Sequence, residues 1–71
     1  MSQTKPATPS TPITVLDTLR EHPGGVSDEL LVSMVAERAD ASAFLVRVTL
    51  GRLERDGEIY KAGDVWKVTR P

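Results

Sequence analysis

The sequence predicts a mainly helical α+β fold in which three helices precede a small β-hairpin. Apolar residues recur at helical spacing in three segments before the Asp56-Gly57 pair. Side chains that favour helix N-termini stand at the start of each segment. After Asp56-Gly57, two short runs rich in β-branched and aromatic residues flank a second glycine-containing turn. A helix that runs directly into a hairpin therefore forms the second half of the chain.

Size and charge limit the classes of function. With 71 residues and 39% apolar content, the chain has room for one small domain with one core. Nine Lys and Arg against ten Asp and Glu give a net charge of −1, unlike proteins that coat nucleic acid by charge alone. Six of the nine basic residues lie from Arg47 onward, so positive charge concentrates in the second half.

Catalysis and membrane insertion are not expected. The chain has no cysteine, a single histidine (His22) and no glycine-rich phosphate loop, so we expect no metal, cofactor or small-molecule substrate and no enzymatic activity. No apolar run approaches the roughly 18 residues that span a bilayer, and the N-terminus lacks a signal peptide's apolar segment. The expected location is cytoplasmic, and nucleoid-associated if the protein binds DNA.

Residues 1–10 are predicted to be a disordered tail, because they combine prolines with small polar residues. The domain is then residues 11–71. We expect Thr11 to cap the first helix and Pro12 to begin it, with an end near Glu21 before a Pro-Gly-Gly stop. The predicted buried positions of this helix are Ile13, Val15, Leu16 and Leu19.

The second helix follows a short strand at Val26-Ser27. Ser27 is the expected N-cap, and Asp28 with Glu29 would suit the helix dipole in the first turn. The helix should end near Arg38. Residues 39–42 form a short turn in which Asp40 or Ser42 caps the third helix, as in a helix-turn-helix. The predicted apolar stripe of the second helix is Leu30, Leu31, Met34 and Val35.

The third helix, residues 43–55, has two contrasting faces. Its core side consists of Val46, Leu50 and Leu53 at spacings of four and three. Phe44, Val48, Gly51 and Arg55 lie opposite, flanked by Arg47 and Arg52, with Leu45 at the border. Two sizeable apolar side chains are therefore expected to project outward among three arginines.

The hairpin is predicted from two strands, 58–61 and 65–69, joined by residues 62–64. Trp66 is expected to be buried rather than available to stack on a base. Ile59 and Val68 should point inward with it. The residues expected on the wing surface are Tyr60, Lys61, Lys67 and Arg70.

This order of elements resembles the winged helix-turn-helix superfamily over residues 11–69. The ending LGRLERDGEIYKAGDVWKV is similar to the C-terminal winged helices of archaeal minichromosome maintenance helicases and of the replication protein A middle subunit. The similarity consists of Leu53, Asp56-Gly57, Ile59-Tyr60 and Trp66 in comparable order. The resemblance implies three helices and a two- or three-stranded wing.

Double-stranded DNA is the expected partner, with the third helix in the major groove and the wing on the backbone, in a small regulator of transcription or replication. Arginines would contact guanine, Phe44 and Val48 would contact thymine methyl groups, and lysines would contact phosphate. The expected DNA-binding residues are Ser42, Phe44, Arg47, Val48, Arg52, Arg55, Lys61, Lys67 and Arg70.

The sequence leaves two alternatives open. The arginines would be a solvated face if they paired with Glu54, Asp56 and Glu58, and such exposed pairs contribute about 0 to 1 kcal/mol. Alternatively, the face of Phe44 and Val48, with Leu45 at its edge, would be a protein-interaction or dimerisation surface. Burying a valine or phenylalanine is favourable by roughly 1.5 to 3 kcal/mol, which favours a partner that covers them.

Overall fold

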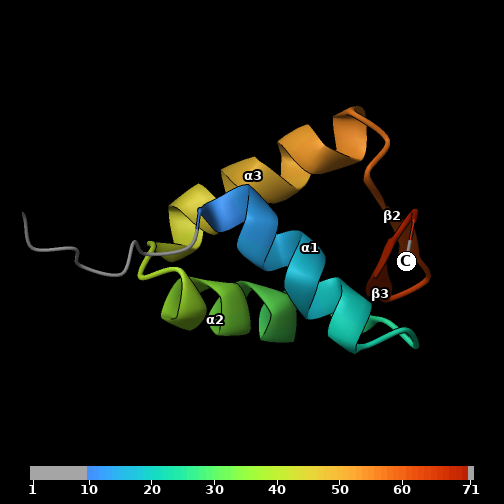
Figure 1. Cartoon of the computed structure of the whole chain (residues 1–71), viewed down its shortest axis with the longest axis horizontal. Coiled ribbons are helices and arrows are strands. Elements are labelled where there is room, and N and C mark those ends of the chain that lie inside the picture. The colour runs from blue at the N-terminus through green and yellow to red at the C-terminus, as the bar shows by residue number, and fades with distance from the viewer. Residues whose placement is uncertain (1–9, 71) are drawn as a thin grey trace, which may run out of the picture.

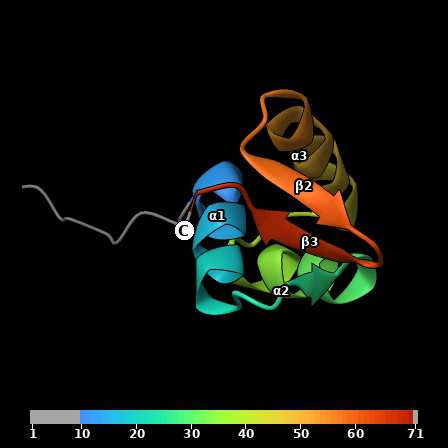
Figure 2. The ribbon, with the colours of Figure 1, turned by 90° about the vertical axis from the view of Figure 1, so that its right-hand side faces the viewer.

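The computed structural model describes residues 10–70 and confirms the α+β fold with a hairpin-like wing. Within these residues three helices pack together. The sheet lies at one end of them (Figures 1 and 2). The predicted tail lies outside the described residues except for Ser10. The elements in chain order are α1 (Thr11–Glu21), β1 (Val26–Ser27), α2 (Asp28–Arg38), α3 (Ala43–Arg55), β2 (Ile59–Ala62) and β3 (Val65–Val68).

The antiparallel sheet has the strand order β1-β3-β2, so the wing includes the short strand that precedes α2. Trp66 in β3 pairs with Val26 on one side and Lys61 on the other. The hairpin loop is one residue shorter than predicted, because Ala62 pairs with Val65 as the last residue of β2. Gly63 then occupies the first loop position with φ of 65°, as a two-residue type II′ turn requires.

Each helix begins at a serine. The hydroxyls of Ser10, Ser27 and Ser42 accept the backbone N–H three residues on, at 3.3, 3.4 and 3.0 Å. The Ser27 and Ser42 caps were predicted, but the prediction of Thr11 as N-cap was wrong. Thr11 already has helical geometry, and Ser10 has the extended backbone of a cap residue.

The ends of α2 and α3 share one hydrogen-bond pattern. After α2, the N–H of Asp40 donates to Glu37 and that of Ala41 to Ala36, and the matching bonds after α3 come from Gly57 and Glu58. This Schellman arrangement needs a left-handed residue just beyond the cap. Gly57 has φ of 78°, as predicted, whereas Asp40 has φ of 51° and so ends α2 rather than capping α3.

The core lies where the three helices meet the inner face of the sheet, and Trp66 is buried as predicted. Two expected core residues were wrong: Ile13 is 57% exposed and Leu30 is 54% exposed. Val32 is buried instead, and Leu16 and Met34 are half-buried against the core. The buried apolar residues are Val15, Leu19, Val26, Leu31, Val32, Val35, Ala39, Val46, Leu50, Leu53, Ile59 and Trp66.

The predicted core face of α1 was wrong at Ile13 because two threonines occupy buried positions on this helix. Thr14 and Thr18 are buried beside Val15 and Leu19, so the core side of α1 is rotated away from Ile13. The Thr14 hydroxyl donates to the Ser10 carbonyl at 2.8 Å, and Arg38 donates to the Thr18 hydroxyl at 3.1 Å. Because these bonds satisfy the hydroxyls, polar side chains occupy core positions without a large desolvation cost.

Among the glycines, Gly25 approaches another part of the chain most closely. It has φ of 98°, and a Cβ at this position would lie 2.5 Å from Val65 Cγ2 and 3.2 Å from the Trp66 carbonyl oxygen. We expect Gly25→Ala to destabilise the protein by more than about 1 kcal/mol, since the left-handed backbone and the clash both oppose alanine. In thermal unfolding this lowers Tm by at least about 4 °C.

The adjacent Gly24 supplies the matched control, because no described atom lies within 4 Å of the position that an added Cβ would take and its φ is not left-handed. Gly24→Ala should change stability by less than about 0.5 kcal/mol. Equal effects of the two substitutions would contradict the close approach of Gly25 to β3.

Candidate nucleic-acid interface

The outward face of α3, defined as Phe44, Val48, Gly51 and Arg55, is exposed as the sequence predicted. Phe44 is 77% exposed and Val48 is 44% exposed. Leu45, at the border of this face, is 46% exposed. The opposite side of the helix buries Val46, Leu50 and Leu53 together with Thr49. The helix therefore presents large apolar side chains to solvent while its other side holds the core.

Gly51 lies in the middle of this face, and outside its own stretch of helix no described atom would lie within 4 Å of an added Cβ. Packing within the described chain therefore does not require glycine here. Glycine in a helix interior costs about 0.8 to 1 kcal/mol relative to alanine. Because position 51 has no side chain, the helix backbone between Val48 and Arg55 is open to close approach by another molecule.

Arg52 and Arg55 are exposed near the C-terminal end of α3. Within residues 10–70 neither guanidinium lies within 4.0 Å of a carboxylate, so the alternative of pairing with neighbouring acids is not realised for them. Both positive charges also lie in the last turn, where they suit the helix dipole. They remain available to an anionic partner.

Arg47, by contrast, belongs to a cluster around the carboxylate of Asp28 at the start of α2. The Trp66 indole N–H donates to Asp28 Oδ1 at 2.9 Å, and Arg47 Nη1 donates to Oδ2 at 3.1 Å. Lys61 Nζ lies 3.9 Å from Oδ1 and 4.7 Å from the centroid of the Trp66 ring. Two of the predicted DNA-binding residues therefore share one counter-ion. The alternative that Arg47 pairs with Glu54, Asp56 or Glu58 is not realised, because Arg47 pairs with Asp28.

This cluster lowers the pKa of Asp28. The hydrogen bond from Trp66, aided by Arg47 and Lys61, holds the pKa of the Asp28 carboxyl below its ordinary value of 3.8, although partial burial opposes the shift. The sequence pattern connected Asp28 only with the helix dipole. The cluster joins residues 19 and 38 positions apart, a separation at which no local pattern indicates contact.

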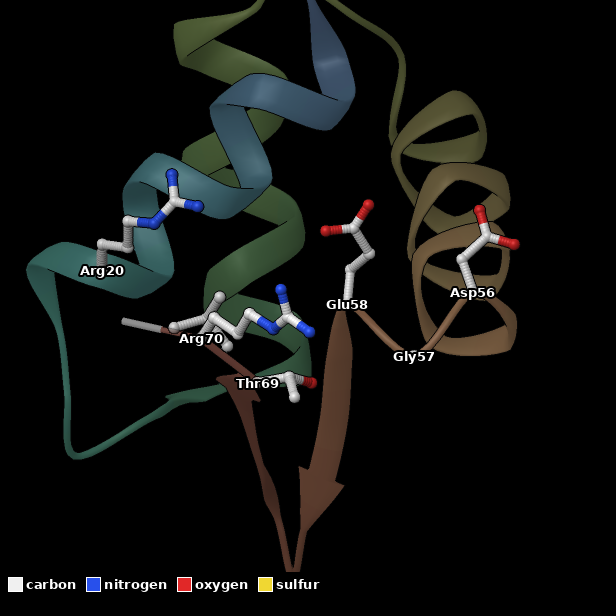
Figure 3. A pocket seen from close by; sticks show the side chains of 7 residues that line it. Arg20, Asp56, Gly57, Glu58, Thr69 and Arg70 are labelled. Atoms are coloured by element: carbon white, nitrogen blue, oxygen red, sulfur yellow. The ribbon is translucent and has the colours of Figure 1, made fainter.

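Arg70 and Lys67 lie on a different part of the surface. Arg70 lines a groove of about 520 Å³ with Arg20 of α1 and Glu58 at the start of β2. Figure 3 shows side chains of both signs around this groove, between α1 and the turn after α3. Lys67 lines a smaller hollow of about 270 Å³ with Tyr60 and residues of α1. Arg70 is therefore near the base of the sheet, not at the hairpin tip.

The predicted DNA-binding residues thus fall into three groups. The first is on α3, the second surrounds Asp28, and the third is at the outer sheet and its base. The α3 group is Ser42, Phe44, Val48, Arg52 and Arg55; the Asp28 group is Arg47 and Lys61; the sheet group is Lys67 and Arg70. The α3 group is exposed and has no ion-pair partner within residues 10–70; the same holds for Arg70, whereas Lys67 is half-buried.

Acidic side chains and the lone histidine do not gather into a metal centre in the part of the chain that the structure describes. No set of three His, Cys, Asp or Glu side chains between residues 10 and 70 is arranged to hold a metal ion. In that same range, none of the helices has the length and apolar character needed to cross a membrane.

The fold defines a small α+β domain with three helices and a three-stranded antiparallel sheet. Comparisons with protein-family models, curated proteins and solved structures found no match to this chain.

The Asp28 cluster should support stability only while the carboxylate is charged. Because its pKa is lower in the folded than in the unfolded chain, this contribution is complete above the ordinary value of 3.8 and is lost as pH falls through the folded pKa. We expect Asp28→Asn to lower Tm at neutral pH, and the difference from wild type to shrink progressively as pH falls below 3.8. Thermal unfolding across this pH range measures both effects.

Glu29→Gln is the control, because Glu29 also lies in the first turn of α2 but makes no ion pair within residues 10–70. It should retain most of the wild-type stability at neutral pH. Equal destabilisation by both substitutions would assign the effect to the helix dipole instead of the cluster.

Proposed function

We propose that this protein is a winged helix-turn-helix protein that binds double-stranded DNA and regulates transcription or replication without catalysing a reaction. One observation carries the proposal: the exposed side of α3 combines the apolar side chains of Phe44 and Val48 with two arginines. Neither arginine has an acidic partner within residues 10–70. In this proposal α3 enters the major groove, whose width admits one α-helix. The protein would act in the cytoplasm, on the nucleoid.

The residues of α3 match the chemistry of the groove. Arg52 and Arg55 can each donate two hydrogen bonds to guanine, and Phe44 and Val48 can contact thymine methyl groups. The Ser42 hydroxyl accepts the Leu45 N–H, so its own O–H can donate to a phosphate oxygen. Base contacts and backbone contacts would thus come from the same helix.

The remaining basic residues would contact phosphate. Lys67 and Arg70 carry charge on the sheet and at its base. Arg47 and Lys61 are shared with Asp28, so phosphate oxygens would compete with that carboxylate for them. Asp28 would then control how strongly Arg47 and Lys61 can contact DNA phosphates. Such control is compatible with a chain whose net charge is −1.

Replacing Arg52 and Arg55 by alanine tests the proposal. For wild type we expect log Kd to vary with log salt at a slope of magnitude about 3 to 5, which corresponds to about four or five phosphates. The double variant should bind duplex DNA at least about tenfold more weakly, with a shallower slope, in a fluorescence anisotropy titration.

Arg38→Ala is the matched control, because Arg38 bonds Thr18 and Glu21 of α1 and lies away from the proposed contacts. It should leave DNA affinity unchanged at temperatures where the variant is folded. A salt-independent wild-type affinity, or equal losses in both variants, would contradict DNA binding through α3.

Asp28→Asn should have the opposite effect on DNA binding. Asparagine can still accept the Trp66 N–H, but it removes the negative charge that holds Arg47 and Lys61. We expect a several-fold higher affinity and a steeper salt dependence, by about one to two units of slope. Unchanged affinity and slope would show that neither side chain approaches phosphate.

A protein partner is the second candidate, favoured by the exposure of Phe44. A near-neutral net charge suits such a partner better than it suits a polyanion.

A further inference from the structure

We propose that the groove at the base of the sheet binds a free α-amino acid with a large apolar side chain. The two charged groups of the amino acid would lie in the groove, between Arg20, Glu58 and Arg70. Its side chain would lie in the adjoining hollow, beside Tyr60. This inference does not depend on DNA binding through α3, because no residue of that helix lines either space.

The groove presents charges of both signs that do not pair with each other. Figure 3 shows the guanidinium groups of Arg20 and Arg70 and the carboxylate of Glu58 extending into the same space. Within residues 10–70, neither Arg70 nor Glu58 lies within 4.0 Å of an opposite charge. In the same range Arg20 pairs with the exposed Asp17, at 3.4 Å. A single ligand that carries both charges would therefore bridge groups that the fold brings together without joining them.

The balance of these charges selects the chemistry of the ligand. The arginines Arg20 and Arg70 share the lining with two acids, Asp56 and Glu58, so the formal charge of the groove is zero. A polyanion that entered the groove would meet repulsion from both acids. An α-amino acid instead carries a carboxylate and an ammonium group on one carbon. The carboxylate can accept hydrogen bonds from the arginines while the ammonium group donates to Glu58.

Backbone hydrogen bonds fix the two sides of the groove before any ligand arrives. The Thr69 N–H donates to the Glu58 carbonyl at 2.9 Å, which joins the residue before β2 to the residue after β3. The Glu58 N–H donates to the Leu53 carbonyl at 2.9 Å, which ties the same residue to the end of α3. Arg20 belongs to the last turn of α1. Binding would therefore order side chains and not backbone, which lowers its entropic cost.

The adjoining hollow is the place for an apolar side chain. It shares Arg20, Val68 and Thr69 with the groove, so the two spaces are neighbours. Its volume is about 270 Å³, and its lining includes Tyr60 and Pro23, both of which are exposed. An amino acid held by its charges in the groove would extend its side chain into this hollow. Contact with an aromatic residue there would favour large apolar side chains over glycine.

An amide chemical-shift titration with L-phenylalanine, at neutral pH and constant ionic strength, tests the site. Because most of the lining is exposed, we expect a dissociation constant of about 0.1 to 10 mM. The amide signals of Gly57, Thr69 and Arg70 should shift and saturate, and those of Phe44 and Val48 on α3 should not move. Glycine should bind at least about tenfold more weakly, since it has no side chain for the hollow.

Two derivatives of phenylalanine separate the roles of the charges. N-acetylphenylalanine keeps the carboxylate and loses the ammonium group, and phenylalanine amide does the reverse. Each should bind at least about tenfold more weakly than phenylalanine, because it loses one set of charge-assisted hydrogen bonds.

Variants of the protein then assign each charge to its partner. Glu58→Gln should weaken phenylalanine and phenylalanine amide at least about tenfold and leave N-acetylphenylalanine unchanged. Arg70→Gln should weaken phenylalanine and N-acetylphenylalanine and leave phenylalanine amide unchanged. Glu54→Gln is the matched control, because Glu54 is an exposed acid of α3 that does not line the groove. It should bind all three ligands as wild type does.

Several outcomes would overturn the proposal. Shifts that do not saturate up to about 50 mM phenylalanine would exclude a site of the expected affinity. Equal binding of phenylalanine and its two derivatives would show that the charges are not recognised. Equal losses for all three ligands in Glu58→Gln would make the role of Glu58 structural. Displacement of phenylalanine by inorganic phosphate, with tighter phosphate binding by Glu58→Gln, would make the groove an anion site.

The titration contains no DNA, so its result is separate from that of the Arg52 and Arg55 substitutions. Failure of phenylalanine to bind would leave DNA binding through α3 standing, and the reverse also holds. In the function proposed above Arg70 also contacts phosphate, so a bound amino acid would compete with DNA for this side chain.

Discussion

The carboxylate of Asp28 joins parts of the chain that are far apart in sequence. Its ion pair with Arg47 also determines which positive charges α3 presents to solvent. One oxygen accepts the Trp66 indole N–H at 2.9 Å, and the other accepts from Arg47 at 3.1 Å, so α2, α3 and β3 are joined at one point. Lys61 of β2 lies against the same carboxylate and over the Trp66 ring. The indole N–H would otherwise be a buried donor without a partner, which would cost about 1 to 3 kcal/mol. Asp28 therefore permits a tryptophan at the centre of the sheet.

The same contact determines which charges α3 presents. Arg47 would add a third cation beside the exposed Phe44 and Val48, but its ion pair draws it toward α2. Arg52 and Arg55 remain, both in the last turn. The outward face of α3 is consequently apolar along its first two turns and positive only at its end. A uniformly basic recognition helix would favour any polyanion, whereas this distribution allows both a DNA groove and an apolar partner.

Elements that depend on local chemistry were predicted well from sequence. The bounds of α2 and α3 follow from caps, glycine and periodicity, and those of α1 follow to within one residue because Ser10, not Thr11, is its N-cap. The exposure of Phe44 follows from the opposite placement of Val46, Leu50 and Leu53. Errors arose where side chains form bonds that hydrophobicity does not encode. Thr14 and Thr18 took core positions because their hydroxyls find partners, and Ile13 was displaced to the surface. The Asp28 cluster could not be predicted, because it requires the folded positions of four elements: α2, α3, β2 and β3.

Two features of α3 lower the stability of the isolated chain, and no contact within residues 10–70 compensates for them. Gly51 costs about 0.8 to 1 kcal/mol as a helix residue, and Phe44 leaves burial energy of roughly 1.5 to 3 kcal/mol unrealised. For a small domain, whose net stability is typically about 0.05 to 0.15 kcal/mol per residue, the two together are a large fraction of the total. Both occur on one face of one helix, and the described chain covers neither. No contact within residues 10–70 recovers this energy, and a bound molecule that covers this face and approaches the helix backbone at Gly51 would recover it.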